Sequence, residues 1–167
     1  MLMAFLSRIF PRTIDNTYRG HWLALVLLVP ILFVYSVMSI NISLNTYEIA
    51  TTADNIPLDT YPAGAASHIL KSFKAWALGH LLLTLLGWLA LIRYRAMVPL
   101  YFLLMTLESL GRNWMSMPNP IHTLSTLSPI GAVINLTLLL GLLLGFGLSQ
   151  SRRAGAEQSV ELPKGTR

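Results

Sequence analysis

The stretch AMVPLYFLLMTLESLGRNWMSM, residues 96 to 117, decides how many times this chain can cross a membrane. From residue 96 to Leu107 it carries only uncharged residues, about 18 Å of helix at 1.5 Å per residue. A hydrocarbon core is about 30 Å thick, so a helix that ends at Leu107 is too short to span it. A third spanning helix must therefore carry Glu108 and Arg112 into the membrane and continue to residue 117, just before two prolines.

The composition places the rest of the chain in a membrane as well. Hydrophobic residues make up 54% of the 167 residues and charged residues only 11%, against about 25% in soluble domains. The formal net charge of +5 comes from basic residues that flank apolar runs, so we interpret it as a topology signal and expect no nucleic-acid partner. Because the chain has no cysteine, disulfides, thiolate metal sites and dithiol redox chemistry are excluded.

Four apolar stretches predict an all-α integral membrane protein, a four-transmembrane-helix bundle that occupies residues 21–150. The expected spans cover residues 22–40, 69–92, 96–117 and 130–150. Pro62 suits a helix start, so the second helix should begin before its span and project from the bilayer. The remaining segments are a cytoplasmic amphipathic N-terminal segment (1–20), an outer loop (41–68) and a disordered cytoplasmic tail (151–167).

The distribution of basic residues predicts the orientation of this bundle. Cytoplasmic segments are enriched in Lys and Arg, so the side with most of them should be cytoplasmic. With both termini cytoplasmic (N-in/C-in), only Lys71, Lys74 and Arg112 approach the outer side. The basic residues that then share the cytoplasmic side are Arg8, Arg12, Arg19, Arg93, Arg95, Arg152, Arg153, Lys164 and Arg167.

Counting residues from Tyr94, in the turn between the second and third spans, predicts one polar layer. Glu108 and His80 each lie 14 residues from it, and Arg112 and Trp76 each lie 18 residues from it. In an antiparallel hairpin each pair is level, and a cation–π contact between Arg112 and Trp76 becomes possible. Residues of the first and fourth spans reach a similar depth, and the predicted layer consists of Tyr35, Trp76, His80, Glu108, Arg112 and Asn135.

Three interpretations of this layer stay open from the sequence alone, and in one of them the third helix is wrongly placed and Glu108 and Arg112 lie in water. An internal ion pair with a few hydrogen bonds can simply fix helix packing in a small membrane bundle. Ionisable residues inside a membrane are also functional candidates, here for a proton or ligand site. The paired histidines His68 and His122 lack a third ligand at fixed spacing, so we expect no metal site.

The segment GLLLG, from Gly141 to Gly145, has the small-xxx-small pattern that lets two helices approach closely. On a helical wheel these glycines point about 100° away from Asn135, so the fourth span has two contact faces. The glycine face can pack within the chain or against another protein chain.

Four segments carry a resemblance to a known group of proteins. They are TYRGH (17–21), ADNIPLDTY (53–61), RYRAMVPL (93–100) and LESLGR (107–112). Together they resemble small four-helix bacterial inner-membrane proteins. The resemblance implies the four-helix topology and the bacterial cytoplasmic membrane, and it brings neither an activity nor catalytic residues.

Two functions from different classes follow as expectations. The first is a multi-pass membrane protein without catalysis or cofactor, which packs in the lipid bilayer with partner proteins or with a second copy, as an accessory subunit or assembly factor. The second is a small proton-coupled transporter, or a lipid- or quinone-binding protein, that uses the layer of Glu108 and His80. No complete set of catalytic residues is present, so we expect no enzyme.

Overall fold

The computed structural model describes residues 6–7, 9–11, 13–116 and 129–151 of the chain. Within these residues the secondary structure is helical and contains no strand. Four long helices dominate it, with a short helix α3 (Thr46–Glu48) and short helical turns at Ile49–Ala53, Leu58–Thr60 and Arg95–Met97 between them. The long helices are α2 (Trp22–Leu44), α4 (Ala63–Ile92), α5 (Val98–Ser116) and α6 (Pro129–Gln150).

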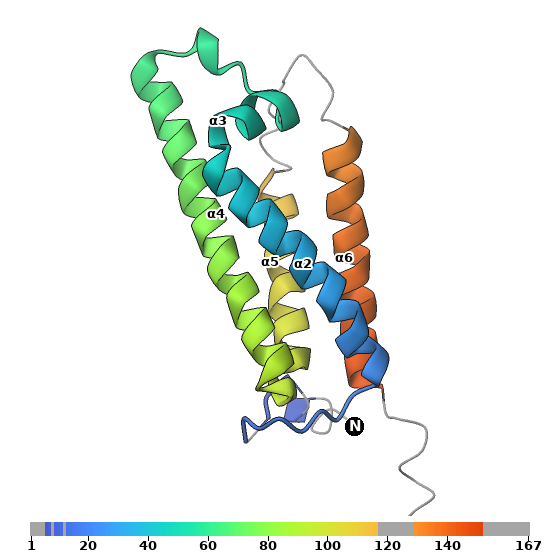
Figure 1. The fold of residues 1–167 in the computed structure, drawn as a ribbon. Helices are drawn as coiled ribbons and strands as arrows, with labels where there is room; N and C mark the ends of the chain where they lie inside the picture. Colours follow the sequence, from blue (N-terminus) through green and yellow to red (C-terminus); the bar gives the residue numbers. More distant parts are fainter. Residues whose placement is uncertain (1–5, 8, 12, 117–128, 152–167) are drawn as a thin grey trace, which may run out of the picture.

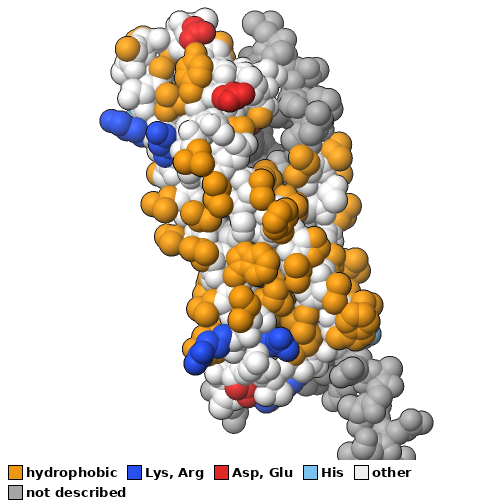
Figure 2. All heavy atoms as spheres, in the orientation of Figure 1, with side chains coloured by type: hydrophobic (Ala, Val, Ile, Leu, Met, Phe, Trp, Pro, Cys, Tyr) orange, Lys and Arg blue, Asp and Glu red, His pale blue; other side chains and the backbone are white. Residues whose placement is uncertain are grey.

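Three of these helices, α2, α4 and the Val133–Gln150 part of α6, are long and apolar enough to cross a membrane. They confirm the all-helical class and indicate a membrane protein. In Figure 2 hydrophobic side chains cover the middle of the visible face, and Lys and Arg side chains gather at the base and on the upper part of α4. The helix with Glu108 and Arg112, α5, is not among the three.

The four long helices form a bundle in which α2 is central. It packs against both α4 and α6, while α5 lies behind it and packs mainly against α6 (Figure 1). The sequence neighbours α4 and α5 contact each other less, although only a short turn joins them. The helices lie closest together at the base, and α4 and α6 diverge toward the opposite end (Figure 1).

Two helices extend beyond the predicted spans. The first was expected to end at residue 40, but α2 continues to Leu44 because Ile42 is buried and Asn45 hydrogen-bonds Asn41 through both backbone and side chain. The helix α4 begins at Ala63, directly after Pro62, as the proline had indicated. Most of the predicted outer loop is therefore helical. Within the predicted N-terminal segment, residues 1–5, 8 and 12 lie outside the described residues. So do the predicted tail beyond residue 151 and His122.

The core of the bundle is apolar and receives side chains from each long helix. Leu28 and Leu32 of α2, Phe102 and Met105 of α5 and Leu142 of α6 are fully buried. The buried threonine hydroxyl groups are tolerated among them because each bonds to a carbonyl of its own helix. Thr84, for example, donates to the carbonyl of His80 at 2.8 Å, and Thr106 to that of Phe102 at 2.7 Å.

The glycine pair of α6 packs inside the bundle. A Cβ at Gly141 would lie 3.3 Å from the Ile31 side chain of α2. A Cβ at Gly145 would overlap the ring of Phe102, whose Cδ1 would be 2.9 Å away. Both glycines thus serve contacts within the chain, so the GLLLG pattern provides no argument for a second protein chain.

Candidate functional site

The side chains of the predicted layer come from four helices that meet in the half of the bundle farther from the base. Tyr35 lies on α2, and Trp76 and His80 lie one turn apart on α4. Glu108 and Arg112 lie one turn apart on α5. Since residues four apart share one helix face, each pair presents two side chains in the same direction.

Three rings and a guanidinium group form a continuous series of contacts across the bundle. The ring of His80 lies 4.7 Å from that of Tyr35, centroid to centroid, at an angle of 40°. On its other side His80 meets Trp76 edge to face at 5.8 Å. The guanidinium carbon of Arg112 lies 5.5 Å from the Trp76 centroid, within the roughly 6 Å reach of a cation–π interaction.

The end of this series is an ion pair within α5. Arg112 Nε lies 3.3 Å from Glu108 Oε1, and the two side chains are 32% and 26% exposed, respectively. The other carboxylate oxygen, Glu108 Oε2, is buried and has no hydrogen-bond partner among the described residues. Glu108 and His80 were predicted to be level, but no hydrogen bond joins them in the described part of the chain. The connection runs through Trp76 and Arg112.

A small cavity opens inside this ring of side chains. It has room for about one water molecule. His80 is only 7% exposed. Its Nδ1 is buried and has no hydrogen-bond partner among the described residues. The residues that line the cavity are Tyr35, Met38, Ser39, Ile42, Trp76, Ala77, His80, Arg112 and Asn135.

The structure therefore gathers five of the six residues of the predicted layer around one cavity, with Glu108 attached through Arg112. Asn135 reaches the cavity from α6, although its side chain is largely exposed. Ser39, which is buried and lines the same cavity, is absent from the predicted layer. Its spacing of four residues from Tyr35 was the available signal, because that spacing places both on one face of α2.

The side chains of the site are suited to hydrogen bonding. Within the described residues, no three His, Asp or Glu side chains come together as metal ligands. Neutral imidazole offers one donor and one acceptor, the hydroxyls of Tyr35 and Ser39 can do both, and arginine only donates. Such a set suits a water molecule, a proton or one polar group of a larger molecule.

Comparison with protein-family models, with curated proteins and with solved structures finds no match for this chain. The resemblance to small four-helix bacterial membrane proteins therefore stays a prediction, and the function has to be argued from the site.

Proposed function

We propose that this chain is a multi-pass protein of the bacterial cytoplasmic membrane, with α5 as a fourth span and both termini cytoplasmic. The length of α5, 19 residues, corresponds to about 28 Å of helix, close to the thickness of the hydrocarbon core. On α4 the distance from Lys74 to Arg93 is likewise about 28 Å. Basic residues would then mark both interfaces, the snorkelling lysines at the outer one.

If α5 spans the membrane, Glu108, ten residues after Val98, lies about 15 Å along the helix and near the midplane. We propose that the bundle binds a proton or a small polar molecule here, without catalysis. One observation carries the proposal: His80 Nδ1 and Glu108 Oε2 are both buried without a partner among the described residues. An unsatisfied buried polar group costs about 1 to 3 kcal/mol, which a hydrogen bond to a water molecule or to a polar group of a ligand would offset.

The cavity size favours the proton over a larger ligand. It has room for about one water molecule, which is too little for the head of a quinone. Glu108 already shares an ion pair with Arg112, so His80 is the group that can gain and lose a proton. The proposed function is thus a proton-linked one, with His80 as the proton-binding residue.

Proteoliposomes test this function. The purified protein is reconstituted around a trapped pH-sensitive dye, and a potassium diffusion potential is imposed. We expect proton uptake above that of protein-free liposomes, and a loss of most of it in His80→Phe. His68→Phe is the matched control, because His68 lies on the same helix, exposed and outside the cavity. Uptake equal to that of empty liposomes, or equal uptake by parent and His80→Phe, contradicts the proposal.

A second candidate function, packing with a partner protein, rests on a different observation. About a third of the Arg112 side chain is exposed (32%) at a level that would be inside the membrane, beside the loosely packed seam of α4 and α5. A neighbouring transmembrane helix would shield it from lipid. The particle mass in mild detergent tests this candidate, since a lone chain contributes 18.5 kDa and any stable partner or second copy adds to it.

A further inference from the structure

A second pocket lies at the base of the bundle, far from the polar layer. Residues 13–21 run beneath the long helices before α2 begins (Figure 1). Two backbone hydrogen bonds hold this segment. Ala96 N donates to the carbonyl of Asp15 at 3.3 Å, and His21 N donates to that of Leu148 at 3.1 Å. The segment is therefore fixed against both the turn after α4 and the end of α6.

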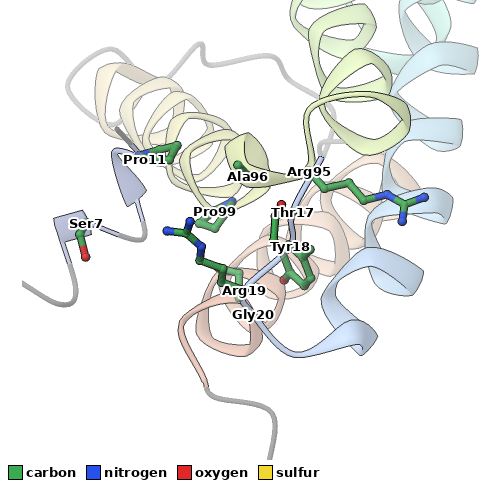
Figure 3. Close-up of a pocket in the computed structure, with 10 residues that line it drawn as sticks. Ser7, Pro11, Thr17, Tyr18, Arg19, Gly20, Arg95, Ala96 and Pro99 are labelled. Atoms are coloured by element: carbon green, nitrogen blue, oxygen red, sulfur yellow. The ribbon is translucent and has the colours of Figure 1, made fainter. Parts of the chain in front are cut away.

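The pocket between this segment and the start of α5 encloses room for about one to two water molecules. Figure 3 shows its lining. Arg19 reaches toward Pro99 and Pro11, while Arg95 leaves the opposite side. Thr17 adds a hydroxyl group. Among the described residues, the polar side chains of the wall are all hydroxyls or guanidinium groups, and none is a carboxylate.

The hydroxyl of Tyr18 is the group of this wall that points to a ligand. It is buried and has no hydrogen-bond partner among the described residues. It also lies close to Gly20, where a Cβ would come within 2.6 Å of it and within 2.5 Å of the Ser149 carbonyl oxygen. Burial raises the pKa of Tyr18 above its ordinary value, so the phenol keeps its proton and remains a donor. A buried donor without an acceptor indicates an acceptor ligand.

The charges around the pocket are one-sided. Arg19 brings a positive charge to it, whereas the guanidinium group of Arg95 points away from the pocket (Figure 3). Arg95 donates its Nε to the carbonyl of Leu91 at 3.1 Å, which anchors its stem at the end of α4. The nearby Asp15 accepts the backbone N–H of Thr17 on Oδ1 at 2.9 Å and does not line the pocket. Arginine and hydroxyl donors with no carboxylate favour a phosphate group.

We propose that this pocket binds the phosphate of an anionic lipid headgroup. Arg19, Tyr18 and Thr17 contact the phosphate oxygens. The level of the pocket favours a lipid over free phosphate, because it lies where the apolar part of α4 ends, the depth of the headgroups. Pro11 and Pro99 give the wall an apolar part against which the glycerol portion can pack. This site does not depend on the polar layer or on its proposed function.

The test is a lipid titration of the full-length protein in mild detergent, followed by thermal unfolding. We expect phosphatidylglycerol to raise the melting temperature of the parent and phosphatidylcholine to leave it unchanged. Arg19→Gln should weaken the apparent affinity for phosphatidylglycerol roughly tenfold, since it removes a charge-assisted contact. Tyr18→Phe, which deletes one oxygen atom, should weaken it about threefold.

Arg93→Gln is the matched control, because Arg93 is an exposed arginine at the end of α4 that does not line the pocket. It should bind phosphatidylglycerol like the parent. The proposal is overturned if Arg19→Gln and Tyr18→Phe keep the parental affinity, or if Arg93→Gln loses as much as Arg19→Gln. It is also overturned if inorganic phosphate alone produces the whole shift, because the site would then be one for free phosphate. Circular dichroism of each variant establishes that the helices are intact.

Discussion

A double-mutant cycle at Glu108 and Arg112 should show that the two replacements are unequal. At 3.3 Å and an effective dielectric constant of 20, two unit charges attract by about 5 kcal/mol. Partial exposure of both side chains reduces this value. In Arg112→Gln the carboxylate loses its cation, so we expect a loss of roughly 2 to 3 kcal/mol. In Glu108→Gln the amide oxygen can still accept from Arg112 Nε, and the contact with Trp76 remains, so we expect about 1 kcal/mol.

The double replacement should be more stable than Arg112→Gln, since neither charge is then left alone. For a chain of this size 1 kcal/mol corresponds to about 2 to 4 °C. Thermal unfolding in mild detergent should therefore rank the proteins as parent, Glu108→Gln, double replacement and Arg112→Gln, or place the middle two together. Lys74→Gln, which removes an exposed cation of α4, should melt like the parent. If all variants melt alike, both charges are solvated, and α5 is not a span.

Three further predictions concern other parts of the chain. Reporter fusions near Asn55 should lie outside, and those at either terminus and near Tyr94 in the cytoplasm; a cytoplasmic reporter near Asn55 would reverse the orientation. Gly145→Ala should lower the melting temperature by several degrees because its Cβ meets the ring of buried Phe102, an overpacking of about 1 to 3 kcal/mol, whereas Gly147→Ala, with open space around its Cβ, should not. The hydrogen bond from Tyr47 to Asp59, 2.8 Å long, raises the pKa of the Tyr47 phenol. The stabilising contribution of this bond is therefore present below the ordinary tyrosine pKa and is lost as the pH rises through the higher pKa of the folded state. Tyr47→Phe should remove this alkaline part of the pH profile of the melting temperature, and an unchanged profile would rule out a role for the bond.

The sequence was sufficient for the level of each polar side chain, because a helix has a fixed rise and the turn at Tyr94 is short. Counting from this turn pairs Arg112 with Trp76, and the structure has the guanidinium group 5.5 Å from that ring. The same count pairs Glu108 with His80, but for this pair it predicts only a shared depth and no contact. Which side chains touch at one level depends on how each helix is rotated, and rotation follows from packing that one sequence does not reveal.

Helix rotation also explains the glycine face of α6. The pattern from Gly141 to Gly145 predicts a close contact but not its partner. The structure directs Gly141 to Ile31 and Gly145 to Phe102, which are large side chains of two different helices. The pocket at the base could not be predicted from the sequence for a related reason. Residues 13–21 have no helical or strand periodicity, and they are positioned by backbone hydrogen bonds to residues up to 127 positions away, as His21 and Leu148 illustrate.

The same close contacts account for where the cavity forms. Toward the base, Gly87 of α4 accommodates Leu32 and Tyr101, and Gly145 accommodates Phe102, so large side chains fill the space between the helices. Farther from the base α4 and α6 diverge (Figure 1), and the bundle is filled there by His80, Trp76 and Arg112 around a residual cavity. The cavity at His80 therefore lies beyond this tightly packed part of the bundle. Replacing Gly87 or Gly145 with alanine should lower the melting temperature, because a Cβ at either position would meet these large side chains.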